Sequence, residues 1–170
     1  MAVNLELKIR VNSISIIVRK LKSINAVYKG LLMQKDVYYS YDKGLLKLRI
    51  ENGKYTLIKY LRDEKGKDRF SNYDYLKFSY GNAENFLKEI LKIEAVVQKK
   101  RLLYMYDNTR IHLDTVKGLG YFLELETLVI NGKNDAKKRF AFIKEALELN
   151  ELAEIKKSYR DLIIASKKSK

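Results

Sequence analysis

Ionisable side chains stand at alternate positions in the stretch RIHLDTVKGLGYFLELE, with apolar residues between them. They are Arg110, His112, Asp114, Glu124 and Glu126. In a β-strand, residues two apart share a face, so each set would line one face of its strand. Carboxylates bind hard divalent cations, and cationic side chains bind phosphate. The spacing therefore indicates either an ordinary solvated sheet surface or a polar site for metal and phosphate.

The same alternation of charged and apolar residues occurs in other segments, at Glu6/Lys8/Arg10, Lys47/Arg49 and Lys99/Arg101. On an open sheet these faces would be solvated, as on any amphipathic strand. A barrel of about eight strands can instead enclose a small ligand, with the charges pointing inward. Buried Lys and Arg side chains are costly without a bound anion. Closure therefore predicts a wet tunnel that holds a polyanion, with carboxylates that balance charge or bind a divalent cation.

The composition narrows the classes of partner and metal. The 170 residues include 35 Lys+Arg and 21 Asp+Glu, and the net charge of +14 predicts an anionic partner, the alternative being solubility through self-repulsion. Cysteine is absent and there is one histidine, so thiolate and His-rich metal sites are excluded and Mg²⁺ or Mn²⁺ on carboxylates is favoured over Zn²⁺. Without a signal peptide or an apolar run long enough to span a membrane, we expect a cytoplasmic protein with no membrane partner.

Periodicity predicts the elements that position these residues. Apolar residues at helical spacing predict helices over about 14–26, 83–92 and from about 134 onward, with a last short helix that begins at Ser158 and has Asp161 in a capping-box-like position. Strands are expected over 3–12, 28–42, 45–62, 69–80, 95–114 and 121–130, with hairpin turns at Asn52-Gly53 and Asp107-Asn108 and a charged turn over 63–68. With no repeats or linker, residues 1–170 are predicted to form one α+β domain.

Stretches in order along nearly the whole chain resemble the motifs of the CYTH superfamily, the triphosphate tunnel metalloenzymes. The most specific is HLDTVKGLGYFLELE, and NLELK is similar to the Glu-x-Glu-x-Lys signature of the first strand, with Asn4 in place of the first Glu. Further matches are QKDVYY (34–39), LKLR (46–49), LIKYLR (57–62), DRFSNY (68–73), KKRLLY (99–104) and SYRDL (158–162). The superfamily includes class IV adenylyl cyclases, thiamine triphosphatases and inorganic triphosphatases, and the first of these is the branch that the chain resembles most.

The resemblance implies a closed eight-stranded antiparallel β-barrel, or tunnel, with flanking helices and inward charges. It implies that a triphosphate is bound by Lys8, Arg49, Arg62, Arg69, Lys99, Arg101 and Arg110, where Arg62 substitutes for a lysine that relatives carry at the position of Tyr60. Mg²⁺ or Mn²⁺ would be held by Glu6, Asp114, Glu124 and Glu126. The candidate catalytic residues are Glu6, Lys8 and Asp114.

The implied activity is that of a class IV adenylyl cyclase, which converts ATP to cyclic AMP and pyrophosphate. The alternatives are hydrolysis of tripolyphosphate or thiamine triphosphate, or a non-catalytic triphosphate-binding module, since the amide of Asn4 cannot replace a carboxylate. A nucleic-acid partner is disfavoured because many cations are expected to face inward. His112 is expected to pack or form a hydrogen bond rather than to catalyse. The oligomeric state stays open, a homodimer included.

Overall fold

The computed structural model describes residues 2–62, 70–78 and 82–168, and at residues 2, 61, 62 and 70–72 it describes the backbone alone. This part of the chain forms eight strands and four helices. The strands are β1 (Ala2–Arg10), β2 (Val27–Tyr39), β3 (Leu45–Glu51), β4 (Lys54–Arg62), β5 (Phe70–Phe78), β6 (Ile93–Tyr106), β7 (Thr109–Val116) and β8 (Gly120–Leu128). The helices are α1 (Ile14–Ser23), α2 (Ala83–Ile90), α3 (Lys133–Ala146) and α4 (Tyr159–Lys168).

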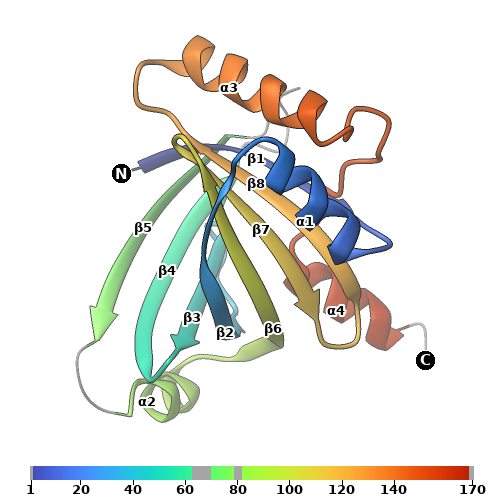
Figure 1. Ribbon diagram of the computed structural model, residues 1–170. Coiled ribbons are helices and arrows are strands. Elements are labelled where there is room, and N and C mark those ends of the chain that lie inside the picture. The colour runs from blue at the N-terminus through green and yellow to red at the C-terminus, as the bar shows by residue number, and fades with distance from the viewer. Residues whose placement is uncertain (1, 63–69, 79–81, 169–170) are drawn as a thin grey trace.

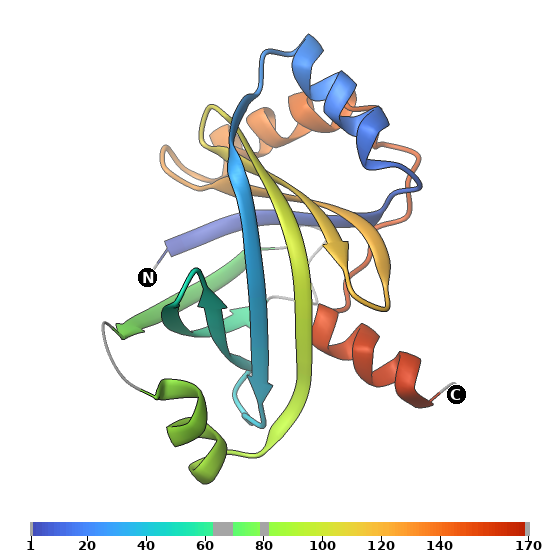
Figure 2. The same ribbon diagram turned by 60° about the horizontal axis from the view of Figure 1, so that its bottom comes forward.

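All strand pairs are antiparallel, and the strongly curled sheet has the order β1-β5-β4-β3-β2-β6-β7-β8 (Figures 1 and 2). β8 returns to β1, so the ladder closes on itself. The closing seam is short, because β1 pairs with β5 at four positions and with β8 at seven. Beyond the seam, the backbone N–H of Ile155 donates to the Lys8 carbonyl at 2.7 Å. The predicted α+β architecture with antiparallel strands is confirmed, whereas a tube closed along its whole length stays a prediction.

The outer face of β1, β7 and β8 carries the main hydrophobic core, and α1 and α3 lie side by side over it (Figures 1 and 2). Alternate residues of these strands form the sheet side of this core, and they are joined by helix residues such as Leu21 and Ile143, both fully buried. The sheet residues are Leu7, Ile9, Ile111, Leu113, Leu123 and Leu125. Because the apolar faces of β1, β7 and β8 pack against the helices, the charged faces of these strands point into the curl of the sheet.

Helix α4 packs at one end of the interior. Its first residue, Tyr159, forms a cluster with inward-facing apolar residues of four strands, namely Tyr38, Val97, Val116 and Phe122. The helix begins with the predicted capping arrangement: the Asp161 carboxylate accepts from the Ser158 hydroxyl at 2.6 Å and from its backbone N–H at 2.9 Å. One end of the interior is therefore closed by an apolar plug whose position depends on the C-terminal helix.

Several boundaries differ from the predictions. The first helix ends at Ser23 rather than near 26, because Asn25 takes a left-handed conformation with φ 58°. The strand and turn expected over 28–42 are confirmed, since β2 runs to Tyr39 and a turn follows at 42–43. The C-terminal helical pattern is interrupted between α3 and α4, where Glu148 also has a positive φ of 56°.

Both predicted hairpins are present. Asn52 and Gly53 have φ angles of 49° and 73°, as the predicted turn requires. The charged turn over 63–68 lies outside the described residues. None of the described helices is both long enough and apolar enough to cross a membrane.

Candidate functional site

The curled sheet encloses a cavity of about 190 Å³ whose lining includes residues from all eight strands and from α4. Nine of the lining side chains are ionisable acids or bases, and they come from the inward positions that alternate with the core residues. They are Glu6, Lys8, Lys47, Arg49, Lys99, Arg101, Arg110, Glu124 and Glu126. The alternation seen in the sequence therefore builds a charged interior rather than a solvated outer face.

One group of charges surrounds Asp36, which is fully buried on β2. Its cross-strand neighbour on β3 is Arg49, which donates from Nε and NH2 to the two carboxylate oxygens at 2.8 Å each. Lys47 donates to Oδ2 at 3.1 Å, and Lys99 Nζ lies 3.7 Å from the same oxygen. Three cations thus share one carboxylate, and this part of the interior carries excess positive charge.

A second group surrounds Asp114 on β7, which is also fully buried. Arg101, its cross-strand neighbour on β6, donates from Nε at 2.7 Å and from NH2 at 2.6 Å. The Tyr159 hydroxyl donates to the same carboxylate at 3.0 Å. Arg101 NH2 also donates to Glu124 at 2.6 Å. Asp114 therefore orients Arg101 and anchors the start of α4.

Lys8 connects β1 to the group around Asp114. Its ammonium lies 3.2 Å from Glu124 Oε1, which faces it across the β1/β8 ladder, and donates to the Lys157 carbonyl at 3.2 Å. The ammonium groups of Lys8 and Lys99 lie 4.1 and 4.9 Å from the centre of the Tyr159 ring. Each geometry is within the range of a cation–π contact. Tyr159 thus fixes the positions of two interior lysines as well as that of Asp114.

An acidic group with one imidazole lies on β7 and β8. Single donor atoms of His112, Glu124 and Glu126 all lie within 4.8 Å of one another. Arg110 NH1 lies 3.8 Å from Glu126, and its side chain is half exposed. Glu6 faces Glu126 across the β1/β8 ladder and also lines the cavity. Carboxylates with an imidazole match the donor types of a divalent-cation site.

The cationic end of the cavity is the group around Asp36, with Lys47, Arg49 and Lys99. Burial and neighbouring charges set the protonation of these side chains. Burial would raise the pKa of Asp36, but Arg49, Lys47 and Lys99 outweigh it and hold this pKa well below its usual range. Burial, with Arg49 close by, lowers the pKa of Lys47 to about 8. Burial and Arg101 likewise lower the pKa of Lys99 to about 8. At neutral pH the two lysines are therefore mostly charged, close to the point where they lose a proton.

The acidic end of the cavity is the group of His112, Glu124 and Glu126. Burial and the nearby Arg101 lower the pKa of His112, so its ring is neutral at pH 7. Burial would raise the pKa of Glu124, but Lys8 outweighs it and holds this pKa well below its usual range. The pKa of Glu126 is also lowered, since His112 and Arg101 outweigh burial. Neutral imidazole and ionised carboxylates are the forms that bind a metal ion.

The interior charges nearly cancel. Six described cations face five described carboxylates, namely Lys8, Lys47, Arg49, Lys99, Arg101 and Arg110 against Glu6, Asp36, Asp114, Glu124 and Glu126. Most of the net charge of +14 therefore lies elsewhere on the chain. Among the described residues the inward cations do not account for this excess, because the carboxylates lie in the interior with them.

The structure brings most of the predicted site residues together. Lys8, Lys99 and Arg101 are buried, and Arg49 and Arg110 line the same cavity. Asp114, expected as a metal ligand and catalytic residue, has both oxygens engaged by Arg101. Asn4, at the position of the missing signature carboxylate, is buried and lines the cavity. Arg62 lies on β4 with its side chain outside the described part, and Arg69 lies outside the described residues.

Four residues of the site were absent from the predicted set, one of them being His112, which was expected to pack or form a hydrogen bond. Asp36 and Lys47 alternate with Tyr38 and Arg49 along β2 and β3, so the period of two could have found them once these strands were paired. Tyr159 carries no such signal, because it lies at the start of a helix and reaches the interior through the packing of α4. Only its place in the SYRDL motif marked it.

Comparisons with known proteins agree with this architecture. The family model described as the CYTH domain matches residues 2–159. A curated relative from Methanocaldococcus jannaschii, named "putative adenylate cyclase", is 26% identical over 172 residues, which is 94% of this chain and 98% of the relative. The solved structure of a Pyrococcus horikoshii protein is 27% identical, with a TM-score of 0.77 over 94% of this chain and 98% of that chain.

A conserved hypothetical protein from Pyrococcus furiosus has the same fold, with a TM-score of 0.79 at 22% identity over 94% of this chain and 99% of that chain. The family model spans β1, all the other strands and the start of α4, which are the elements that build the charged interior. By the match of its sequence to this model over nearly its whole length, the chain belongs to the CYTH family.

Proposed function

We propose that the protein binds a triphosphate inside the curled sheet and catalyses a metal-dependent phosphoryl-transfer reaction on it. The observation that carries this proposal is the set of inward cations, of which Lys8, Lys99 and Arg101 are 2%, 5% and 3% exposed. Their carboxylate partners hold them in place, and around Asp36 three cations, Arg49, Lys47 and Lys99, gather at one carboxylate. A triphosphate carries about four negative charges near neutral pH, and its phosphate oxygens would accept charge-assisted hydrogen bonds from these cations.

The arginines are prepared for phosphate by their carboxylate partners. Asp36 and Asp114 each engage Nε and NH2 of one guanidinium, which leaves NH1 of Arg49 and Arg101 without a hydrogen bond to a described residue. A guanidinium held in one orientation loses less side-chain entropy when it binds phosphate oxygens. Lys47 and Lys99 add point charges between the two arginines. These residues would orient the triphosphate and replace its hydration shell.

A divalent cation fits the acidic end, where Glu124, Glu126 and the buried Nδ1 atom of His112 converge and Glu6 lines the same cavity. When bound, Mg²⁺ or Mn²⁺ would neutralise phosphate charge and lower the pKa of a nucleophilic hydroxyl. The chain's own residues hold the phosphates in place beside it.

The first candidate reaction is the cyclisation of ATP to cyclic AMP and pyrophosphate. In this reaction the ribose 3′-hydroxyl attacks the α-phosphorus and displaces pyrophosphate. Lys47, Arg49 and Lys99 would bind this leaving group. The name of the curated relative from Methanocaldococcus jannaschii supports this reaction over others.

The second candidate is hydrolysis of a compact triphosphate such as tripolyphosphate, with thiamine triphosphate as an organic alternative. The size of the cavity favours it, since about 190 Å³ is small beside the roughly 300 Å³ that drug-sized ligands need. A triphosphate tail would fit within this volume, and a nucleoside would have to remain at the mouth. The same cations would hold the chain of phosphates while water attacks the terminal phosphorus.

The test is an assay of the purified protein with ATP, tripolyphosphate or thiamine triphosphate in the presence of Mg²⁺ or Mn²⁺. Cyclic AMP and pyrophosphate would identify the first reaction, and free phosphate without a cyclic product the second. Arg49→Gln should weaken tripolyphosphate binding at least about tenfold. Lys59→Gln, which changes a half-exposed side chain paired with Asp74, is the control and should leave binding unchanged. Failure of the unmodified protein to bind either ATP or tripolyphosphate would overturn the proposal.

A further inference from the structure

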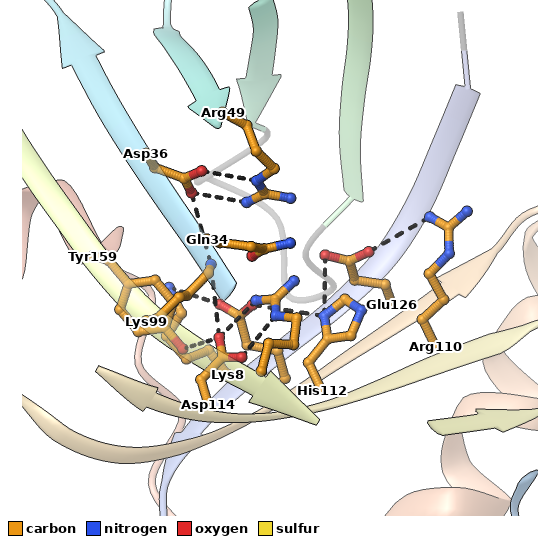
Figure 3. A network of polar contacts seen from close by, with 12 residues as sticks. Lys8, Gln34, Asp36, Arg49, Lys99, Arg110, His112, Asp114, Glu126 and Tyr159 are labelled. Carbon is orange, nitrogen blue, oxygen red and sulfur yellow. Dashed lines mark hydrogen bonds and ion pairs between the residues drawn. The ribbon is translucent and has the colours of Figure 1, made fainter. Parts of the chain in front are cut away.

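The Nδ1 atom of His112 is buried in the interior without a hydrogen bond to a described residue. The residue is 4% exposed. The nearest acidic oxygens are Oε1 of Glu126 at 3.7 Å and Oε2 of Glu124 at 3.9 Å. Figure 3 shows the ring directed toward Glu126. Because a buried polar atom without a partner costs free energy, this orientation needs a reason other than the stability of the unliganded fold.

The spacing of these atoms is close to that of ligands around one ion. Two neighbouring ligands of an ion bound at about 2.1 Å lie about 3 Å apart, and two opposite ligands about 4.2 Å apart. The separations of 3.7 and 3.9 Å lie between these values. All three donor atoms lie within 4.8 Å of one another, so small rotations of these side chains would bring them to the distances required around one ion.

The backbone holds this arrangement in place. His112 and Glu124 are direct cross-strand partners on β7 and β8, and Glu126 is two positions further along β8 on the same face. The outer faces of both strands are fixed in the main core through Ile111, Leu113 and other buried residues. A site built from neighbouring strands with locked outer faces loses little entropy when the ion binds.

We propose that His112 is a nitrogen ligand of the metal site, which it shares with Glu126 and Glu124. This proposal rests on the proposed function in one respect, which is that the ion binds beside the same carboxylates. It adds a histidine ligand and a metal preference, neither of which the proposed function requires. Imidazole suits transition-metal ions, whereas Mg²⁺ prefers oxygen donors and water. The mixed ligand set should therefore select Mn²⁺ over Mg²⁺.

The decisive experiment uses the fact that the chain contains one histidine. Untagged protein is prepared unlabelled and with ¹⁵N-histidine, loaded with one equivalent of Mn²⁺ and examined by pulsed electron paramagnetic resonance. Coupling from a directly bound nitrogen, which changes from ¹⁴N to ¹⁵N on labelling, is the expected result and needs no mutation. Bound Mn²⁺ without this coupling, or no stoichiometric binding of Mn²⁺, would overturn the assignment.

Metal affinity gives a second measurement. By isothermal titration calorimetry, His112→Gln should weaken Mn²⁺ binding at least about tenfold and Mg²⁺ binding by less than about threefold. Thr115→Ala changes an exposed side chain on the same strand and should alter neither. Equal losses for both ions, or none, would contradict the metal preference. Tripolyphosphate binding measured without metal reports on the proposed function separately, so the two proposals can fail independently.

Discussion

Two buried Asp–Arg pairs in the interior have nearly the same geometry and different surroundings. In both, one aspartate on a strand receives Nε and NH2 of a cross-strand arginine at 2.6–2.8 Å. Asp36 contacts three neighbouring cations, Arg49, Lys47 and Lys99, of which Lys99 lies equally close, at 3.7 Å, to Asp114. Asp114 instead shares Arg101 with Glu124. The interior is therefore polarised, with excess positive charge near β2 and β3 and excess negative charge near β7 and β8.

This polarity has a chemical meaning for the proposed function. A triphosphate and a divalent cation have opposite charges and would occupy opposite parts of one cavity. The cationic end would hold phosphate oxygens, and the acidic end would hold the ion that neutralises them. A uniform cationic lining would bind phosphate without a place for the metal.

The largest effect is expected from breaking the Asp36–Arg49 pair, which has the more positive surroundings. Asp36→Asn should destabilise the fold by about 3–5 kcal/mol, because Arg49 and Lys47 lose the carboxylate that they share, while Lys99 keeps Asp114. Asp114→Asn should cost less, since Arg101 keeps Glu124 as a partner. Urea unfolding of both variants measures the difference. Equal losses would show that the surroundings of the two pairs do not matter.

The same pair of variants reports on the ligand. Tripolyphosphate should raise the melting temperature of Asp36→Asn more than that of the unmodified protein, because the anion replaces the missing negative charge. A smaller rise in the variant than in the unmodified protein would place the phosphate elsewhere.

The next effect concerns the tyrosine that joins the acidic pair to α4. Tyr159→Phe removes the hydrogen bond to the Asp114 carboxylate and keeps the ring beside Lys8 and Lys99. It should therefore lower the free energy of unfolding by about 1.5–3 kcal/mol. Tyr159→Leu also removes the ring and should cost more and weaken tripolyphosphate binding. Urea unfolding and calorimetry check both expectations. A leucine variant that binds as tightly as the phenylalanine variant would show that the lysines do not need the ring.

A pH titration tests the cationic end. With a pKa of about 8, Lys47 and Lys99 lose charge as the pH rises above 8, so metal-free tripolyphosphate affinity should fall by up to about tenfold per pH unit for each lysine. Stability should change in the opposite direction. The unfolded lysines titrate near 10.4, so the unfolded chain binds more protons between about pH 8 and 10, and the free energy of unfolding of the unliganded protein rises there. An affinity that stays constant from pH 7 to 10 would contradict both pKa values.

The smallest expected effect lies at the acidic end. Asn4→Glu adds a carboxylate to the cavity lining close to Glu6, and it should raise Mn²⁺-dependent turnover several-fold if position 4 belongs to the metal site. Without metal, the extra buried acid should lower the melting temperature. Unchanged turnover would show that position 4 lies outside the metal site and that the missing signature carboxylate is not needed here.

The sequence predicted which side chains line the interior better than it predicted the contacts among them. Period-two alternation placed Lys8, Arg101 and Glu126 on the charged faces of their strands, and the resemblance to the CYTH superfamily implied that these faces point inward. The same pattern could not show that Asp114 would be fully engaged by Arg101, since pairing depends on strand register, which no local pattern specifies. Tyr159 was beyond prediction from periodicity, because its position depends on how α4 docks on the finished sheet. The left-handed residues Asn25 and Glu148, which ended two helical segments, broke otherwise regular apolar patterns.

The place of β1 in the sheet has a consequence for synthesis. This strand precedes the other strands in the chain, yet residues 2–5 pair with β5 and residues 4–10 pair with β8, which ends at Leu128. During translation, residues 6–10 must therefore remain without their β8 partners until β8 has left the ribosome. Such long-range pairing slows folding and leaves an exposed strand edge in the meantime. A ribosome that stalls before β8 would release a fragment prone to aggregation.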